Sequence, residues 1–189
     1  NFESPARRKR FMNAAHERNQ PLAKAIGLHK GVRTVLDGTA GLGMDAQMFL
    51  AWGLKVTAVE RDPILGALWT AGIEKCRDAQ IRTALQNLKF INQDVTQVLK
   101  TTNSKWDVVY LDPMYPERKK GAAAVKKEMQ IFRKLVGSDL DSGEVFELAL
   151  SQAKKRVIVK RPKNAPILID LVPDLQIKGT AVRFDIYLR

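Results

Sequence analysis

The sequence has little of the chemistry that would bind a structural metal or form disulfides. Its 189 residues include one cysteine, Cys76, and two histidines. A single cysteine cannot form an internal disulfide, and a structural zinc site usually needs four cysteine or histidine ligands. We therefore expect no metal, and the low cysteine content suits the cytoplasm.

Long apolar runs and targeting segments are also lacking. No apolar stretch approaches the ~18 residues that a membrane-spanning helix needs, and the first residues do not resemble a secretory leader. There is no internal repeat and no low-complexity tract. These absences predict a cytoplasmic protein without membrane association. Because the first residue is Asn rather than Met, we also expect that residues preceding it are missing.

Positive charge, by contrast, is abundant. The chain has 32 Lys and Arg residues against 20 Asp and Glu residues, which gives a formal net charge of +12. The basic residues gather at 7–10, 117–120, 126–127 and 154–163. Such clusters favour a polyanionic partner, and nucleic acid above all. The alternative is a basic surface with no specific role.

Strands rich in Val, Ile and Leu alternate with helical segments. Strands are expected at 34–37, 55–60, 88–92, 106–111, 155–161, 175–178 and 182–188. Helices are expected after the first strand and at 20–28, 63–76, 78–85, 95–100, 122–136 and 143–153. This alternation predicts an α/β, Rossmann-like fold with a mostly parallel seven-stranded sheet covered on both faces. The last two strands are too close for a crossover helix, so we expect an antiparallel hairpin around Gly179. Residues 1–31 are polar and weakly patterned, so a basic N-terminal segment is expected to precede one domain at 32–189.

A glycine-rich turn follows the first strand. Gly41, Gly43 and Ala46 satisfy the pattern G-x-G-x-x-G/A between a strand and a helix, which is the context that a nucleotide-binding loop requires. Glycines let the backbone turn tightly and approach a ligand. Glu60 ends the next strand, where a carboxylate can accept hydrogen bonds from ribose hydroxyls. The alternative for Glu60 is a surface ion pair with Arg61.

The glycine loop alone does not distinguish a nicotinamide dinucleotide from S-adenosylmethionine, since both carry adenosine. Asp37 at the end of the first strand favours S-adenosylmethionine, because a carboxylate there would repel a pyrophosphate but suits an ammonium or sulfonium group. Asp94 follows the third strand, where it could accept from the adenine amino group. It could also cap the helix 95–100, and a cap would present the backbone N–H of Val95 to the adenine.

The fourth strand ends in the sequence VVYLDPMYP, residues 108–116. Ligands of parallel sheets bind beyond the carboxyl ends of the strands, so Asp112 is expected to face the same crevice as Gly41. Pro113 lacks a backbone N–H, which leaves the Asp112 carboxylate and nearby carbonyls as the dominant polar groups. Acceptors suit a substrate that presents an NH₂ group, and Tyr115 could stack on a flat base.

This arrangement predicts methylation of an exocyclic amine without a metal. Hydrogen bonds from both amino hydrogens to Asp112 and a backbone carbonyl would fix the amine and point its lone pair at the methyl group. Positioning would then supply much of the acceleration. The alternative is that these residues form a rigid turn that merely ends a strand.

These residues resemble the D/N-P-P-Y/F motif of amino-group methyltransferases with the class I, seven-stranded fold. The chain is more closely similar to the small-subunit ribosomal RNA methyltransferase J family. The stretches that carry this resemblance are DGTAGLGMDA (37–46), VVYLDPMYP (108–116), VKKEMQIFRKLVG with DLD (125–141), and KRVIVKRP followed by RFDIY (155–187). The resemblance implies S-adenosylmethionine as cofactor and N2-methylguanosine in 16S ribosomal RNA as product.

The resemblance also implies particular cofactor contacts. They fall at Met44, Asp45, Glu60, Arg61, Asp94, Val95 and Asp112, beside the loop residues Asp37, Gly38, Gly41 and Gly43. Gly38 and Met44 stand where members usually have Ala and Arg, so only the backbone contact of Met44 carries over. Met114 replaces the second proline of the wider motif. Members also have a longer N-terminal region, which we expect this chain to lack.

Basic residues near the predicted catalytic loop are candidate RNA contacts. They follow that loop or leave the fifth strand at the same sheet edge, and they are Lys119, Lys120, Lys126, Lys127, Lys160, Arg161 and Lys163. Phosphate contacts would position RNA without reading its sequence, and a paired guanine would have to leave its stack. The alternative is a solvated charged face. The expected partner is 16S ribosomal RNA or the small ribosomal subunit.

Three other functions are compatible with parts of the sequence. A methyltransferase that acts on DNA adenine N6 or on protein glutamine would use the same cofactor. This function is disfavoured because the residue that follows the fourth strand is an aspartate, Asp112, rather than an asparagine. A nicotinamide enzyme is disfavoured by Asp37 and by the residues that follow the fourth strand. A non-catalytic RNA-binding or assembly factor is disfavoured by the intact Asp112 and glycine loop, and failure to bind S-adenosylmethionine would favour it.

Overall fold

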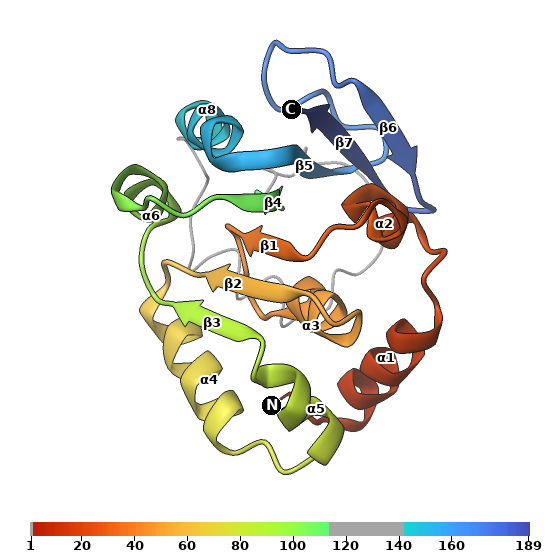
Figure 1. The fold of residues 1–189 in the computed structure, drawn as a ribbon, viewed down its shortest axis with the longest axis vertical. Coiled ribbons are helices and arrows are strands. Elements are labelled where there is room, and N and C mark those ends of the chain that lie inside the picture. Colours follow the sequence, from red (N-terminus) through yellow and green to blue (C-terminus); the bar gives the residue numbers. More distant parts are fainter. Residues whose placement is uncertain (1, 114–141) are drawn as a thin grey trace, which may run out of the picture.

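The computed structural model describes residues 2–113 and 142–189, which form a seven-stranded sheet with helices on both faces (Figure 1). The strands are β1 (Thr34–Asp37), β2 (Lys55–Val59), β3 (Leu88–Ile91), β4 (Trp106–Leu111), β5 (Ala153–Pro162), β6 (Leu175–Lys178) and β7 (Val182–Leu188). The helices are α1 (Pro5–His16), α2 (Pro21–Ile26), the 3₁₀ helix η1 (Leu28–Lys30), α3 (Met44–Ala51), α4 (Pro63–Glu74), α5 (Ala79–Leu85), α6 (Val95–Thr101) and α8 (Ser142–Gln152). The helix expected at 122–136 lies outside the described residues.

The strand order is β3-β2-β1-β4-β5-β7-β6. The strands β1 to β5 pair in parallel, and β7 lies antiparallel between β5 and β6. This order confirms the predicted Rossmann-like fold and the antiparallel pairing across Gly179. Asp37 of β1 is in register with Ala58 of β2 and Tyr110 of β4. The carboxyl ends of these strands therefore meet at one edge of the sheet.

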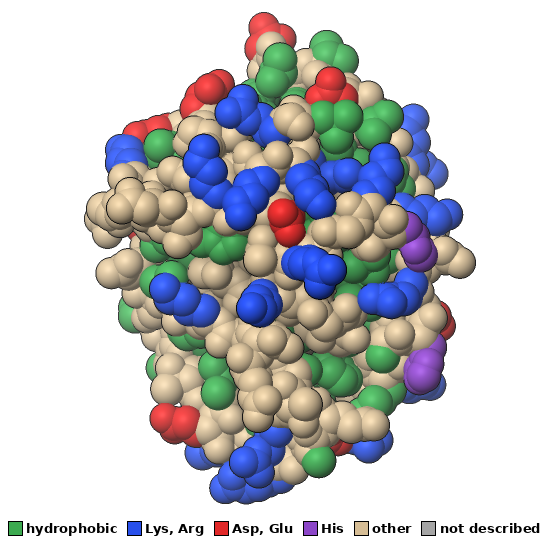
Figure 2. Space-filling model, in the orientation of Figure 1, with side chains coloured by type: hydrophobic (Ala, Val, Ile, Leu, Met, Phe, Trp, Pro, Cys, Tyr) green, Lys and Arg blue, Asp and Glu red, His purple; other side chains and the backbone are tan. Residues whose placement is uncertain are grey.

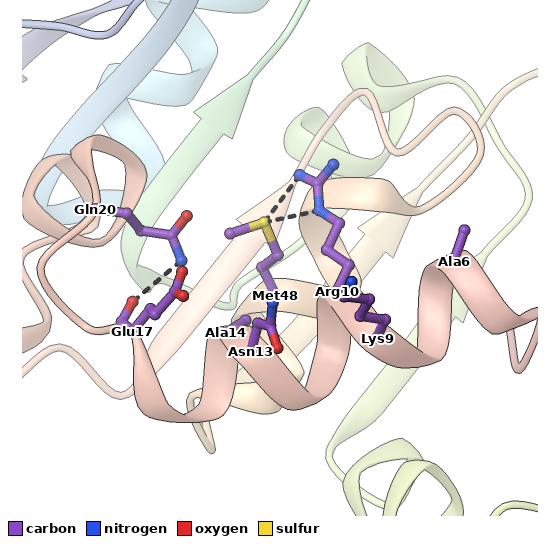
Figure 3. Close-up of a pocket in the computed structure, with 8 residues that line it drawn as sticks. All are labelled: Ala6, Lys9, Arg10, Asn13, Ala14, Glu17, Gln20 and Met48. Carbon is purple, nitrogen blue, oxygen red and sulfur yellow. Dashed lines mark hydrogen bonds between the residues drawn. The ribbon is translucent and has the colours of Figure 1, made fainter.

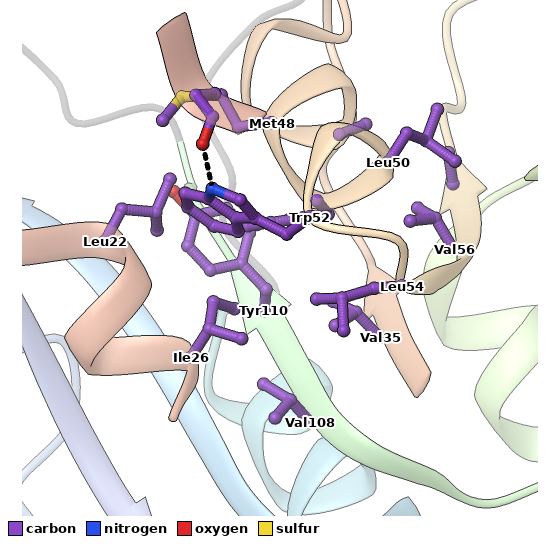
Figure 4. Close-up of a cluster of buried hydrophobic side chains, with 14 of the residues drawn as sticks. Leu22, Ile26, Val35, Met48, Leu50, Trp52, Leu54, Val56, Val108 and Tyr110 are labelled. Atoms are coloured by element: carbon purple, nitrogen blue, oxygen red, sulfur yellow. Dashed lines mark hydrogen bonds between the residues drawn. The ribbon is translucent and has the colours of Figure 1, made fainter. Parts of the chain in front are cut away.

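The core lies on both faces of the sheet because neighbouring strand residues point to opposite sides. Val35 packs with α2 and α3 on one face, whereas Leu36 packs with α6 and α8 on the other. Figure 4 shows part of the first cluster, in which Leu22 and Ile26 of α2, Trp52 at the end of α3 and Tyr110 of β4 are buried together. Figure 1 shows α6 and α8 together on the opposite side of the sheet from α2 and α3.

The helices begin where the sequence provides start residues. Proline occupies the first turn of α1, α2 and α4, where its missing N–H costs nothing. Aspartate caps α4, α5 and α6, and each side chain accepts one or two hydrogen bonds from backbone N–H groups of the first turn. The capping residues are Asp62, Asp78 and Asp94. These capping residues fix where each helix begins.

The N-terminal residues pack onto the sheet domain. Phe2, Phe11 and Ile26 are buried in the same cluster as the strands β1, β2 and β4. The indole Nε1 of Trp52 donates a hydrogen bond to the carbonyl of Ala14 at 2.8 Å, which ties α1 to the end of α3. Residues 2–31 therefore share their core with the described residues of the sheet domain. Sequence analysis predicted no helix at α1.

Within residues 2–113 and 142–189, no helix is long and apolar enough to cross a membrane. The same ranges contain no group of three or more His, Cys, Asp or Glu side chains arranged to hold a metal ion.

Candidate active site

The candidate site lies where β1, β2 and β4 end. Asp37 closes β1, Glu60 follows β2, and Asp112 follows β4. The hydroxyl of Thr39 accepts a hydrogen bond from the backbone N–H of Asp112 at 2.6 Å, and the N–H of Gly38 donates to the Tyr110 carbonyl at 2.9 Å. The structure thus joins the glycine loop directly to the end of β4. The predicted neighbourhood of Asp112 and the loop is confirmed.

The glycine loop is closed on one side and open on the other. Gly41 and Gly43 have positive φ angles of 51° and 75°, which glycine adopts without steric cost. A Cβ on Gly43 would lie 2.5 Å from Trp69, whose indole donates to the Gly41 carbonyl at 2.8 Å. Among the described residues, a Cβ on Gly41 would meet only the Thr39 carbonyl within 4 Å. The loop therefore packs tightly against α4 and leaves space for a ligand at Gly41.

Glu60 holds this loop in place. Its Oε2 accepts from the N–H of Gly41 at 2.8 Å, its Oε1 accepts from the N–H of Asp62 at 2.8 Å, and the residue is buried. Sequence analysis missed this role, because the bond to Gly41 depends on the pairing of β1 with β2. Each carboxylate oxygen has two lone pairs, so Glu60 can still accept from a ribose hydroxyl. The ribose contact stays a prediction.

Asp94 and Gly38 define the side of the site that faces α6. Asp94 accepts a hydrogen bond from the N–H of Thr96 at 2.8 Å, which confirms its predicted role as a helix cap. A Cβ on Gly38 would lie 2.9 Å from Leu111 and 3.0 Å from Val95, so this glycine allows α6 to approach the sheet closely. The N–H of Val95 in the first helical turn has no intrahelical partner. It remains the predicted donor to an adenine ring.

Lys160 bridges two carboxylates in the middle of the site. Its Nζ lies 2.7 Å from Oδ2 of Asp45 and 2.8 Å from Oδ2 of Asp112. Asp45 also accepts from the hydroxyl of Tyr110 at 2.7 Å and pairs with Arg10 at 3.1 Å. The Asp45 side chain is only 12% exposed, whereas the Asp112 side chain is 40% exposed. Asp45 is therefore mostly buried and is bound by several side chains, whereas the Asp112 side chain is accessible from solvent.

Burial and charge shift the acidities of this cluster in different directions. Burial raises the pKa of Asp37 well above its ordinary value, and the Asp45 carboxylate adds to this effect. Burial also raises the pKa of Asp112, against the opposing effect of the Lys160 ammonium. For Asp45, burial is outweighed by Lys160 and Tyr110, so its pKa lies below the ordinary value. For Lys160, burial is outweighed by the two carboxylates, which raise its pKa and keep it cationic.

The remaining predicted cofactor residues surround this cluster. Met44 is the first residue of α3 and is partly buried. Arg61 is exposed and directly follows Glu60. Asp45 faces Lys160, as described above, and its predicted contact with the cofactor stays a prediction. The structure thus brings the predicted cofactor residues to one sheet edge without deciding which of them touch a ligand.

The predicted RNA contacts have different surroundings. Lys163 is exposed beyond β5, whereas Lys160 is engaged by two carboxylates. Arg161 is only 3% exposed, and its guanidinium donates to the Pro166 carbonyl at 3.2 Å. A surface phosphate contact does not fit Arg161, because its side chain points into the protein rather than into solvent. The other candidates lie outside the described residues, and they are Tyr115, Lys119, Lys120, Lys126 and Lys127.

Helix α1 supplies site contacts that sequence analysis missed. The guanidinium of Arg7 donates to the Leu42 carbonyl within the glycine loop at 2.6 Å. Arg10 pairs with Asp45 and also donates to the sulfur of Met48 at 2.9 Å. The basic run at residues 7–10 was noted in the sequence only as a charge cluster. The proline at the start of α1 was the available clue to a helix.

A recess of about 310 Å³ lies along α1, and Figure 3 shows Arg10 and Met48 side by side in it. Lys9 and Asn13 line the recess from α1, and both side chains are exposed. The recess adjoins the carboxylate cluster because Arg10 contributes to both. Its charged lining residues are Lys9, Arg10 and Glu17.

Comparisons with known proteins identify the family. A family model described as "Putative SAM-dependent methyltransferase" matches residues 1–189. Ribosomal RNA small subunit methyltransferase J of Pseudoalteromonas translucida is 44% identical over 185 residues, which cover 93% of this chain and 73% of that protein. The chain belongs to the ribosomal RNA small subunit methyltransferase J family. The resemblance found in the sequence is thereby confirmed.

Two further comparisons agree with this family. Ribosomal RNA small subunit methyltransferase J of Hydrogenovibrio crunogenus is 45% identical over 174 residues, or 90% of this chain, and the chain spans 62% of that relative's length. The crystal structure of a SAM-dependent methyltransferase from Neisseria gonorrhoeae matches with a TM-score of 0.72 and 33% identity, over 89% of this chain and 70% of that one. The second match confirms the methyltransferase fold.

The site has the features that S-adenosylmethionine requires. The backbone at Gly41 leaves space for a close ligand. Asp37, Asp45 and Asp112 form one cluster of carboxyl groups at the same edge of the sheet, and ionised carboxylates suit the ammonium and sulfonium groups of the cofactor. Glu60 keeps the loop open by holding the Gly41 N–H. The residues present therefore fit the cofactor of the family.

Proposed function

We propose that this chain transfers a methyl group from S-adenosylmethionine to the exocyclic N2 amine of a guanosine in 16S ribosomal RNA, in the cytoplasm. The observation that carries the proposal is the position of the Asp112 carboxylate, at the end of β4 beside the glycine loop. The names of the relatives, which specify ribosomal RNA of the small subunit, support the choice of substrate.

Asp112 and Pro113 present acceptors to an incoming amine. Oδ2 of Asp112 accepts from Lys160, and within the described residues no hydrogen bond occupies Oδ1. The side chain is partly exposed, so a substrate N–H can reach it. Pro113 has no backbone N–H that would compete for this oxygen. An NH₂ group of a base would therefore find a free acceptor oxygen at Asp112.

These acceptors prepare the amine for methylation. When bound, S-adenosylmethionine supplies a methyl group whose bond to a positively charged sulfur breaks as the new N–C bond forms. Asp112 accepts one amino hydrogen and a backbone carbonyl near Pro113 accepts the other, so the nitrogen lone pair is turned out of the ring plane. The proton that the methylated amine loses passes to the Asp112 carboxylate and then to solvent. Fixing the reacting groups in this way supplies much of the rate.

Other residues of the site hold the cofactor in this proposal. Asp37 faces its ammonium group, Glu60 accepts from the ribose, and Asp94 with the Val95 N–H contacts the adenine. The buried position of Asp37 and the capping geometry of Asp94 support these assignments. Gly41 provides the open backbone against which the ligand lies.

The RNA substrate is held by basic residues around the same edge. Figure 2 shows Lys and Arg side chains gathered across the upper half of one face of the molecule. Lys163 contributes from the end of β5, and we assign the phosphates nearest the target to four lysines that follow the catalytic loop, Lys119, Lys120, Lys126 and Lys127. The guanine leaves its stack to reach Asp112, and Tyr115 is its stacking platform.

The test is methyl transfer from labelled S-adenosylmethionine to 30S subunits and 16S ribosomal RNA that lack the modification, followed by nucleoside digestion. We expect N2-methylguanosine with the parent and a loss of about 100-fold or more with Asp112→Ala, since a positioned acid–base group contributes at least that much. Asp170→Ala is the matched control, because Asp170 is an exposed aspartate in the segment before β6.

The possible results separate the competing functions. N2-methylguanosine made by the parent and the Asp170 variant, but not by the Asp112 variant, supports both the reaction and the site. Cofactor binding by calorimetry without transfer to either RNA substrate would mean that the acceptor is wrong. A chain that neither binds the cofactor nor transfers a methyl group would favour the non-catalytic RNA-binding reading.

A further inference from the structure

Lys160 lies inside the candidate site, where its ammonium group is bound by two carboxylates rather than exposed to solvent. Its side chain is 22% exposed, and its ammonium group lies between Asp45 on α3 and Asp112 after β4. Both partners are engaged at hydrogen-bonding distance, 2.7 Å and 2.8 Å. The backbone around Lys160 is fixed, because β5 pairs with β4 on one side and with β7 on the other. The ammonium group is thus held in one place by the sheet.

The charged groups that face Asp112 come from several elements. Lys160 of β5 contacts it directly, and the neighbouring Arg161 also favours its ionised form. Asp45 of α3 opposes ionisation, and it is itself held by Arg10 of α1 and by the Tyr110 hydroxyl of β4. The buried carboxyl of Asp37 on β1 belongs to the same cluster. Among the described residues, Lys160 is the cation that directly contacts Asp112.

We propose that Lys160 is a positioning residue that orients the Asp112 carboxylate and keeps it ionised for the amine. The proposal rests on the proposed function, since it assigns a role within the same site. Lys160 binds Oδ2 and thereby turns Oδ1 toward the substrate. The anchor on Asp45 fixes the ammonium group, so that Lys160 cannot follow the substrate or move into solvent.

The chemistry explains why the amine needs this cation. A protonated Asp112 would carry an O–H donor on one of its oxygens, so it would accept hydrogen bonds from the substrate NH₂ group less well and could not take up the proton that the methylated amine loses. Burial and the Asp45 charge both favour that protonated form, and Lys160 opposes them. Because an opposite charge at this distance lowers a carboxyl pKa by about 1–3 units, its removal should raise the pKa of Asp112 by a similar amount.

The experiment compares Lys160→Met, Lys160→Arg and the control Lys154→Met. Lys154 is an exposed lysine at the other end of β5, away from the site. Single-turnover methyl transfer is measured at saturating cofactor and RNA between pH 5 and pH 9. We expect the acidic limb of the profile to move up by about one pH unit or more in Lys160→Met. Lys160→Arg keeps the cation and should leave the limb near that of the parent, as should Lys154→Met.

Two results would overturn the proposal. If Lys160 contacts RNA phosphate instead, Lys160→Met weakens RNA binding and its salt dependence while the acidic limb stays in place. If Lys160 only stabilises the fold, the variant has a lower Tm and a rate that falls equally at every pH. The positioning role is supported if the acidic limb of the pH profile moves to higher pH in Lys160→Met and stays near the parent position in Lys160→Arg.

A second measurement keeps this test independent of the proposed substrate. Carbon-13 labelling of the aspartates allows the Asp112 carboxyl to be titrated by NMR, with Asp112→Asn used to assign its resonance. We expect the midpoint to rise in Lys160→Met and not in Lys154→Met. If the parent methylates no guanosine, the proposed function fails while this titration still decides the role of Lys160. An unchanged midpoint would rule the role out.

Discussion

Asp37 is buried in a position where its negative charge should lower the stability of the free protein but could bind a cationic ligand. Its side chain is buried at the end of β1, and within the described residues its carboxylate accepts only the N–H of Thr39, at 3.3 Å. Burial and the nearby Asp45 charge raise its pKa well above the ordinary value. An ionised carboxylate in such a place costs stability. A cationic ligand would remove part of that cost.

We predict that Asp37→Asn raises the thermal stability of the free protein at pH 8. The native state of the parent holds the Asp37 proton more tightly than the unfolded state, so parent stability falls as pH rises through the range between the two pKa values. The variant lacks this loss, because asparagine carries no charge. The gain in Tm should therefore be largest at pH 8 and vanish toward pH 4, near the ordinary aspartate pKa of about 3.9.

Thermal unfolding of both proteins from pH 4 to pH 8 checks this prediction. Asp170→Asn is the control, because Asp170 is exposed and its substitution should leave Tm almost unchanged at every pH. A gain that is absent, or that grows as pH falls, would contradict the assigned burial cost. Calorimetry on the same variant should show weaker binding of S-adenosylmethionine, since the carboxylate that we propose faces its ammonium group is gone.

The site residues differ in how far the sequence could predict them. Asp112 and Asp94 follow strands, so their place at the carboxyl edge came from local order alone. The bond between Glu60 and Gly41 and the bridge of Lys160 to Asp112 join residues from different strands. Both depend on the register of the sheet, which is set by packing across the whole domain. Neither was visible in the sequence.

At the scale of elements, α1 links the N-terminal residues to the catalytic edge. Phe11 is buried against the domain, and Arg7 and Arg10 reach the glycine loop and Asp45. The helix also packs against α3, which carries Asp45 on its first turn. One element therefore supports both the core and the electrostatics of the site.

We predict that Phe11→Ala lowers the free energy of unfolding by about 3–5 kcal/mol, as expected for truncation of a buried phenylalanine. Lys9→Ala on the same helix is the control, because Lys9 is exposed and should change stability by no more than about 0.5 kcal/mol. Urea unfolding followed by tryptophan fluorescence measures both. A Phe11 variant as stable as the control would mean that α1 is not packed on the domain in solution.

Sequence analysis missed α1 because its apolar residues are few. Phe11 and Ala14 are the buried residues of the helix, and the run of basic residues before them suggested an unstructured polar segment. Helix α2 was predicted, since Gly27 ends it in the left-handed conformation that glycine favours. A short helix of this kind is stabilised mainly by packing against the rest of the protein, which the local sequence does not show.

At the scale of the molecule, the fold was the most predictable property. Alternation of strands and helices predicts a parallel sheet, and the close spacing of β6 and β7 predicts an antiparallel pair. The position of β7 between β5 and β6 was not predicted. Sequence order does not set which strand a returning hairpin joins. That choice buries Ile186 and Tyr187 on opposite faces of the sheet.

The net charge of +12 is a property of the whole chain, but its effect on RNA binding depends on where the charges lie. We predict that Lys126→Glu with Lys127→Glu weakens binding to 16S ribosomal RNA and reduces the slope of log K against log salt by about 1.4–1.8, which corresponds to two phosphate contacts. The measurement is a filter-binding titration of the RNA at several salt concentrations.

The matched control for this last prediction is Lys55→Glu with Lys105→Glu, which changes the net charge equally. Lys55 begins β2 and Lys105 precedes β4, so both lie at the amino edge of the sheet, opposite Asp112, and both are exposed. We expect the control to keep most of the salt slope, because long-range attraction between exposed charges is screened beyond about 8–10 Å at physiological salt. Equal losses in the two variants would show that RNA responds to total charge and that Lys126 and Lys127 make no local contact.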